Sequence, residues 1–295
     1  MPVRLRFDFW HLESAQGSVN ATVTDVLETC RALPPNSERR LLRKDGKVVR
    51  LLNAEPTSSL WLGQFIGIGT GRPAKKAHET GPVSRIPLAA REGLVESNVF
   101  LFDPMTSVLV LQSNRLAASA SSVVRFFNEF EPDVPHIRPV YVISQTGLDE
   151  LGRFRVVRKF TIRLAKMRFG PSFADRGHAA VQLAGLATAI DAQSLNLEVS
   201  VGRQRRRRLD IAAIRQIVSD LFESNDSTME IKRLEITGST DDDEAATVDL
   251  LTQRIVEIVE LDPDDDRDVS YERRRAEIVI AFRKHHAFLR EQFAP

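Results

Sequence analysis

The sequence predicts an α+β fold with two mixed or antiparallel sheets, flanking helices and a long C-terminal helix. Two hairpin signals, Asp45-Gly46 and Asp103-Pro104, each join two apolar-rich runs, which is typical of neighbouring antiparallel strands. Apolar residues at helical spacing occupy other segments, above all residues 270–293 at the C-terminus. A chain of 295 residues can bury a substantial core, and we expect one or two domains.

Residues 1–152 are expected to form an N-terminal α+β domain. It opens with a strand within 3–12 and a helix over 24–33, which Pro34-Pro35 end. The remaining elements are, in order, the first hairpin, a strand over 59–69, a Gly/Pro-rich loop over 69–87, the second hairpin, a helix near 123–130 capped by Ser119 or Ser121, and a strand over 137–144.

Residues 153–268 are expected to form a second α+β domain, and residues 269–295 a C-terminal helix. That helix would be about 35 Å long, and it would pack back on the first domain or lie at a dimer interface. The elements expected between them are a strand over 154–164, an Ala-rich helix over 174–192, a strand over 195–201, a helix that Asp210 caps, and strands over 229–238 and 254–261.

The segment "FRVVRKFTIRLAKMRF" (154–169) opens this second domain and has six cations and no acid. A helical interpretation would leave Phe154 and Ile162 off the apolar stripe, and the Val, Phe, Thr and Ile content favours a strand. As a strand, its two faces alternate. One face would carry Phe154, Val156, Arg158, Phe160, Ile162 and Leu164, and the other Arg155, Val157, Lys159, Thr161 and Arg163.

Charge is segregated along the chain, although the formal net charge is only +1. Residues 151–208 contain 13 Lys and Arg against 3 Asp and Glu, a balance of +10. Residues 209–268 contain 5 against 18, a balance of −13. Such blocks indicate either an anionic partner for the basic part or mutual neutralisation within the fold.

The composition predicts a soluble, cytoplasmic protein. Its one cysteine, Cys30, cannot form an internal disulfide, which fits a reducing compartment. Charges interrupt the apolar residues at the N-terminus, and no later stretch approaches the roughly 20 apolar residues of a membrane span.

Two groups of cations are candidate phosphate contacts. Arg155, Lys159 and Arg163 would form a row on one sheet face, and a duplex presents a charge about every 1.7 Å of its axis. The alternative is a solvated face paired with the acidic block. The second group leads into the helix that Asp210 caps, where unpaired amides and guanidinium groups make an anion site. It consists of Arg203, Arg205, Arg206, Arg207 and Arg208. Its alternative partners are the chain's own acids in "TDDDEAA" or "DPDDDRD".

The enzyme alternative is a metal-dependent nuclease. Glu230-Ile231-Lys232 has a Glu-x-Lys arrangement, and Asp210 or Asp220 lies upstream. The histidines and Cys30 show no metal-ligand or nucleophile spacing. We therefore predict no catalytic residues, no metal site and no cofactor.

One stretch of the first half resembles an uncharacterised family of bacterial and phage proteins. The segment "GLVESNVFLFDPMTSVLVLQSNRLAASASSVVRFFN" (93–128) has that family's Phe/Leu strand, Asp-Pro turn, "VLVLQ" strand, Asn-Arg pair and small-residue helix start. The resemblance carries no assigned activity.

In the order of its elements the chain also resembles the RexA phage exclusion proteins. The shared points are the "KDGK" hairpin, the "FLF" strand, the basic strand, "LNLEVSV", the basic segment before Asp210 and the long last helix. The resemblance implies a homodimer that binds double-stranded DNA without strong sequence preference and senses phage infection, often beside a membrane effector encoded nearby. It also implies a topology similar to the DNA-encircling regulator RdgC. The acidic region 241–268 departs from the pattern.

We therefore expect a dimeric, non-catalytic DNA-binding protein of phage defence or exclusion. The acidic block could occupy the basic groove when DNA is absent. The alternatives are the nuclease and a protein-interaction module whose charge blocks pair between subunits.

Overall fold

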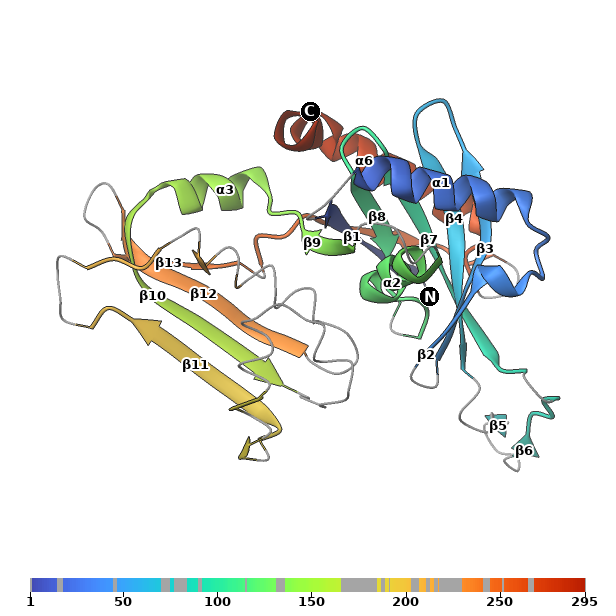
Figure 1. Ribbon diagram of the computed structural model, residues 1–295, viewed down its shortest axis with the longest axis horizontal. Helices are drawn as coiled ribbons and strands as arrows, with labels where there is room; N and C mark the ends of the chain where they lie inside the picture. The colour runs from blue at the N-terminus through green and yellow to red at the C-terminus, as the bar shows by residue number, and fades with distance from the viewer. Residues whose placement is uncertain are drawn as a thin grey trace. The chain divides into compact units, whose positions relative to one another are not determined.

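The computed structural model describes most of the chain, in two compact units (Figure 1). The first unit consists of Met1–Arg138 and Val256–Pro295, and the second of Pro139–Ile255. The described residues are 2–14, 18–44, 47–69, 75–76, 84–89, 92–114, 116–130, 136–165, 185–186, 189–190, 192–202, 207–210, 213–214, 217, 230–240, 245–250, 252–264 and 268–294.

The first unit is built on an eight-stranded sheet of order β14-β1-β8-β7-β4-β3-β2, with β9 also paired to β1. Its strands are β1 (Val3–Ser14), β2 (Leu41–Lys44), β3 (Lys47–Pro56), β4 (Trp61–Gly69), β7 (Leu94–Asp103), β8 (Val108–Gln112), β9 (Ile137–Tyr141) and β14 (Val256–Leu261). A separate two-stranded ladder joins β5 (Lys75–Lys76) to β6 (Ser84–Arg85).

Both predicted hairpins are confirmed. β2 pairs with β3 from Leu41 opposite Arg50 onward, on either side of the Asp45-Gly46 pair, which lies outside the described residues. β7 pairs with β8, and the Asp103 carboxylate closes the turn between them by accepting hydrogen bonds from the Met105 N–H at 3.0 Å and the Thr106 hydroxyl at 2.7 Å. Short polar side chains that bond the following backbone favour such turns.

Helices cover both faces of this sheet. α1 (Val19–Ala32) and α2 (Ala120–Phe130) lie on one face, where Phe65 of β4 contacts Phe126 and Phe127 of α2. α6 (Tyr271–Phe293) lies on the other face and donates a hydrogen bond from Arg274 to Ser97. Ser97 points away from α2 because its neighbour Asn98 is opposite Phe65 in the register.

Helix starts follow their capping residues. α1 begins at Val19, earlier than the predicted residue 24, because the Ser18 side chain accepts a hydrogen bond from the Ala21 N–H at 3.4 Å. α2 begins after Ser119, one of the two predicted caps, whose Oγ accepts from the Ser122 N–H at 3.2 Å.

Several phenylalanines with less than 2% exposure fill the core between the layers: Phe7, Phe9, Phe65, Phe100, Phe102 and Phe127.

The second unit is built on a four-stranded sheet of order β11-β10-β12-β13. Its elements are α3 (Gln145–Gly152), β10 (Phe154–Ala165), β11 (Ser194–Ser200), β12 (Glu230–Thr240) and β13 (Ala245–Asp249). The strand interpretation of 154–164 is therefore confirmed. Most of the predicted Ala-rich helix over 174–192 lies outside the described residues.

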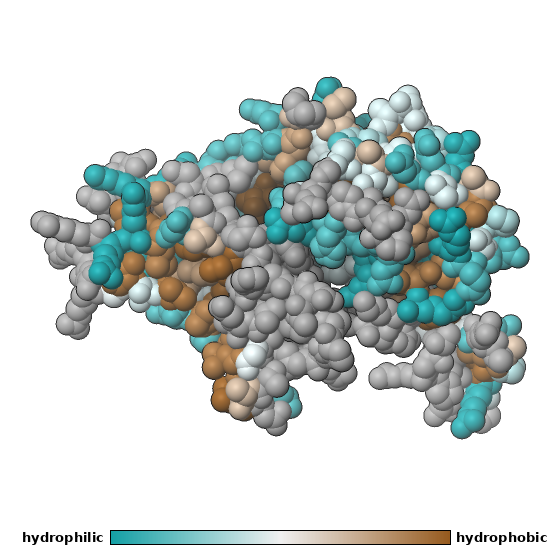
Figure 2. Space-filling model, viewed as in Figure 1, coloured by the Kyte–Doolittle hydropathy of each residue, from teal (hydrophilic) through white to brown (hydrophobic). Residues whose placement is uncertain are grey.

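One face of this sheet carries the apolar core of the second unit. Phe160, Ile162 and Leu164 of β10 are buried there, and Ile214 packs on them from the segment after Asp210. Figure 2 shows apolar residues gathered over these strands on the face in view. The α+β class, with antiparallel sheets and a long C-terminal helix, is confirmed.

The units do not follow the predicted boundaries at 152 and 268. β14 pairs with β1 and so belongs to the first unit, while α3 contacts β10 and β13 and so belongs to the second. Of the two positions expected for the last helix, the structure shows packing on β7 and β8 of the first unit. Among the described residues, no helix has the length and apolar character needed to cross a bilayer.

Candidate nucleic-acid interface

β10 is the strand that carries the first predicted row of cations, and its pairing with β12 is interrupted by bulges. The register shifts between Phe154 and Val156, and again between Val157 and Lys159. A bulge places two residues opposite one and reverses the alternation of side chains. Val157 is therefore buried at 2% exposure, whereas strict alternation predicts it on the cationic face.

Beyond the bulges, the outer face of the sheet has charges of both signs. Lys159 pairs with Glu198 of β11 at 3.4 Å, and Arg233 pairs with Glu235 of β12. Glu198 of β11 and Glu235 of β12 both lie opposite Thr161 of β10, and Glu235 also lies opposite Asp249 of β13. These acids from three strands therefore form one row across the face. Of the predicted cation row, Lys159 is therefore compensated by a carboxylate of its own unit, but Glu198 lies within residues 151–208 and not in the acidic block that the alternative interpretation named.

Backbone hydrogen bonds at the bulged end of β10 join the segment with Arg155 of the first predicted group to the segment with Arg207 and Arg208 of the second. The Leu209 N–H donates to the Val157 carbonyl at 2.9 Å, and the Val201 N–H donates to the Arg158 carbonyl at 3.0 Å. Four arginines lie within two residues of the Leu209–Val157 hydrogen bond along the chain. We call these residues the basic corner: Arg155, Arg158, Arg207 and Arg208.

A turn after β11 allows this approach. Gly202 has a φ of 61°, in the left-handed region that glycine adopts without a Cβ clash. Of the five predicted arginines in the segment that follows, Arg203, Arg205 and Arg206 lie outside the described residues. Arg207 and Arg208 are described, and both are exposed.

Within the described part of the chain, no member of the basic corner forms an ion pair. Arg155, Arg207 and Arg208 are exposed, and Arg158 is half-exposed. Sequence reasoning missed Arg158, because alternation assigned it to the apolar face. The presence of Arg158 among the apolar residues of that predicted face was the sequence feature that could have indicated a bulge.

Asp210 caps the helix that follows the basic corner, as predicted. Its side chain accepts from the Ala213 N–H at 3.3 Å, and its carbonyl accepts from the Ile214 N–H at 3.0 Å. Arg207 and Arg208 therefore precede a helix N-terminus, where the backbone already carries partial positive charge. An anion placed there would interact with both the guanidinium groups and the helix end.

The acids proposed as internal partners are only partly described. Asp264 of "DPDDDRD" accepts from the Ser270 N–H at 2.8 Å and pairs with Arg273. These contacts hold the pKa of the Asp264 carboxyl below its usual value, and they occupy it within the first unit. The residues 241–244 of "TDDDEAA" and 265–267 lie outside the described residues.

The backbone positions of Glu230 and Asp210, the residues of the nuclease alternative that are described, lie far apart. Glu230 is opposite Ala165 in the register, whereas Asp210 follows Leu209, which bonds to Val157. The eight residues of β10 between these points span roughly 25 Å. One divalent ion cannot bridge that distance. Asp220 lies outside the described residues, and in the described part of the chain no three His, Cys, Asp or Glu residues are grouped for a metal.

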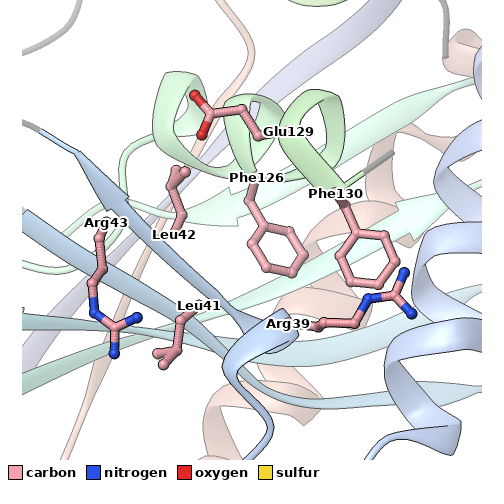
Figure 3. A pocket seen from close by; sticks show the side chains of 7 residues that line it. All are labelled: Arg39, Leu41, Leu42, Arg43, Phe126, Glu129 and Phe130. Carbon is pink, nitrogen blue, oxygen red and sulfur yellow. The ribbon is translucent and has the colours of Figure 1, made fainter. Parts of the chain in front are cut away.

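A cavity of about 200 Å³ in the first unit combines arginines with aromatic rings (Figure 3). The Arg39 guanidinium lies 4.7 Å from the centre of the Phe130 ring, which is a cation–π contact. Arg43, also in its lining, pairs with Glu38. Since both cations already have partners, this cavity is a poorer anion site than the basic corner.

The fold and the basic corner define a class of protein: a two-unit, antiparallel α+β protein with a cluster of exposed arginines. The chain belongs to a family of unknown function (DUF6731), whose profile matches residues 5–292. No curated protein matches the chain.

Proposed function

We propose that this protein binds double-stranded DNA without strong sequence preference, through phosphate contacts made by the basic corner. One observation carries the proposal. The Leu209–Val157 hydrogen bond brings together two basic segments that are about 50 residues apart in the sequence and that each suggested phosphate binding. Guanidinium groups bind phosphate through paired, charge-assisted hydrogen bonds.

A second cationic position on the same strand extends the proposed contact. Arg163 lies opposite Arg233 in the register, and both are exposed. Glu235 already pairs with Arg233, so Arg163 is the cation of this position that has no ion pair with another described residue. Arg163 follows Val157 by six residues, about 20 Å along the strand. Lys159 contributes less, because Glu198 already pairs with it.

The acidic row between these positions limits the number of phosphates that the face can hold. Affinity should therefore depend on few contacts and fall as salt rises, because each neutralised phosphate releases counterions. Contacts to phosphates alone carry no sequence information.

The resemblance to RexA-like proteins supplies the biological setting of the proposal. It suggests a homodimer that acts in phage exclusion or defence, in the cytoplasm and beside a membrane effector. No catalytic step is part of the proposal.

A salt titration of duplex binding tests the proposed function. The comparison is between the unmodified protein and the double variant Arg207→Ala, Arg208→Ala. Loss of phosphate contacts should reduce the slope of log K against log salt by about 0.9 per contact. Arg31→Ala is the matched control, since Arg31 is an exposed arginine on α1 of the first unit. An unchanged slope in the double variant would remove the basic corner from the interface.

The acidic residues 241–244 are proposed to compete with DNA. They lie outside the described residues, but the flanking Thr240 is opposite Phe154, next to Arg155 of the basic corner. Replacing the three aspartates and Glu244 by their amides should tighten duplex binding at low salt. Equal affinity before and after the replacement would contradict this competition.

A further inference from the structure

A second cavity of the first unit, of about 380 Å³, has the composition of a ligand site. It lies between the β3–β4 turn, the β7–β8 turn and residues 279–290 of α6. The two turns are neighbours because Trp61 of β4 is opposite Phe102 of β7 (Figure 1). We propose that this cavity binds a small phosphorylated ligand with a flat ring, of the nucleoside monophosphate class.

The α6 side of the cavity supplies the charge for a phosphate. Arg283, His286 and Arg290 line it at a spacing of three and four residues, so they lie along one side of the helix. Arg283 and Arg290 are about 10 Å apart along the helix axis. Neither guanidinium forms an ion pair with any other residue that the structure describes, and both are exposed. They differ in this from Arg275 and Lys284 of the same helix, which pair with Glu55 and Glu257.

The β3–β4 turn supplies neutral donors opposite these cations. The Thr57 N–H donates to the Leu60 carbonyl at 2.7 Å, and the Leu60 N–H donates to the Thr57 hydroxyl at 3.1 Å. These bonds close the turn with Ser58 and Ser59 at its tip, where both line the cavity and are exposed. Neither serine hydroxyl bonds to another described residue. Serine hydroxyls can donate to phosphate oxygens.

Apolar side chains form the rest of the wall. Leu60 and Met105 line it from the turns, Leu62 lines it from β4, and Val279 and Phe282 line it from α6. Met105 is 50% exposed, and a thioether makes favourable contacts with aromatic rings. A heterocyclic base could stack against this wall while its phosphate reaches the arginines. The volume lies within the range of about 300–1,000 Å³ that is typical of small-molecule sites.

One carboxylate also lines the cavity, but it is engaged in the fold. Asp103 is 2% exposed, and its two oxygens accept hydrogen bonds from Met105 and Thr106 of its own turn. The two arginines therefore outnumber the single acid of the lining, and they favour an anion over a cation.

Isothermal titration calorimetry tests the proposal with the full chain. Each of the four ribonucleoside 5′-monophosphates, its parent nucleoside and inorganic phosphate are titrated separately. At least one nucleotide should bind at least about tenfold more tightly than both its nucleoside and phosphate. The double variant Arg283→Gln, Arg290→Gln should lose at least about tenfold in affinity for it.

The control variant is Arg31→Gln, because Arg31 is an exposed arginine on α1, a helix of the opposite sheet face. It should bind the nucleotide like the unmodified protein, and equal thermal midpoints would show that the double variant folds. The proposal is overturned if none of the four nucleotides binds, if phosphate alone binds equally well, or if the double variant binds normally. The basic-corner variant should keep nucleotide binding, so failure of either proposal can be distinguished from failure of the other.

Discussion

At the scale of single residues, the arginines of this chain fall into groups that the sequence does not separate. Arg40 is 4% exposed and donates to the Cys30 and Leu52 carbonyls, so it holds α1 to β3. Arg274 is 7% exposed and binds Ser97. Arg207 and Arg208 are exposed, with no ion pair to another described residue. Only burial and partners show which arginines are available to an anion.

Gly238 is a residue at which the fold requires the absence of a side chain. A Cβ there would lie 2.1 Å from the Val156 carbonyl oxygen, at the bulge that shapes the basic corner. Gly238→Ala should lower the stability of the second unit by about 1–3 kcal/mol, because the backbone must move. Denaturant unfolding followed by circular dichroism measures this change.

Gly69→Ala is the control for that substitution, since its Cβ would meet its nearest atom at 3.8 Å, an ordinary contact. It should change stability by less than about 0.5 kcal/mol. Similar effects of the two substitutions would argue against a tight bulge at Gly238.

At the scale of elements, α6 is held to β14 by one carboxylate. One oxygen of Glu257 accepts a hydrogen bond from Lys284 at 2.7 Å, and the other lies 2.8 Å from His285 Nε2. Burial alone raises the pKa of Glu257, but the contacts with Lys284 and His285 outweigh it and hold that pKa below its usual value. The charged carboxylate therefore stabilises the packing of α6.

Acid should remove this contribution. A carboxylate with a lowered folded-state pKa stabilises the protein above its unfolded-state pKa, and this stabilisation is lost as pH falls through the folded-state pKa. Glu257→Gln should cost about 1 kcal/mol at pH 7 and less as the pH falls below about 4. Thermal midpoints of the two proteins across this range measure the effect. A constant difference across that range would contradict the assignment.

At the scale of the whole molecule, the second unit is an insertion into the first. The chain leaves the eight-stranded sheet after β9 and returns to it with β14, and both of these strands pair with β1. Each unit has its own buried apolar residues.

Removal of the insertion should therefore leave the first unit folded. A chain in which a short Gly/Ser linker replaces residues 142–255, so that β9 is kept, should keep a cooperative thermal transition and lose duplex binding. Circular dichroism melting and a gel shift measure these outcomes. Loss of the transition would show that the first unit depends on the second.

The sequence by itself determined the fold class, both hairpins, the strand character of residues 154–164 and the Asp210 cap, because each depends on local turn chemistry or periodicity. Only the tertiary structure decided which cations meet. The bulges in β10 reverse its alternation, and the pairing of β14 with β1 divides the acidic block between two units. The pairings of β10 with β12 and of β14 with β1 join segments far apart in the chain, and unlike a hairpin they have no connecting turn that sets the register.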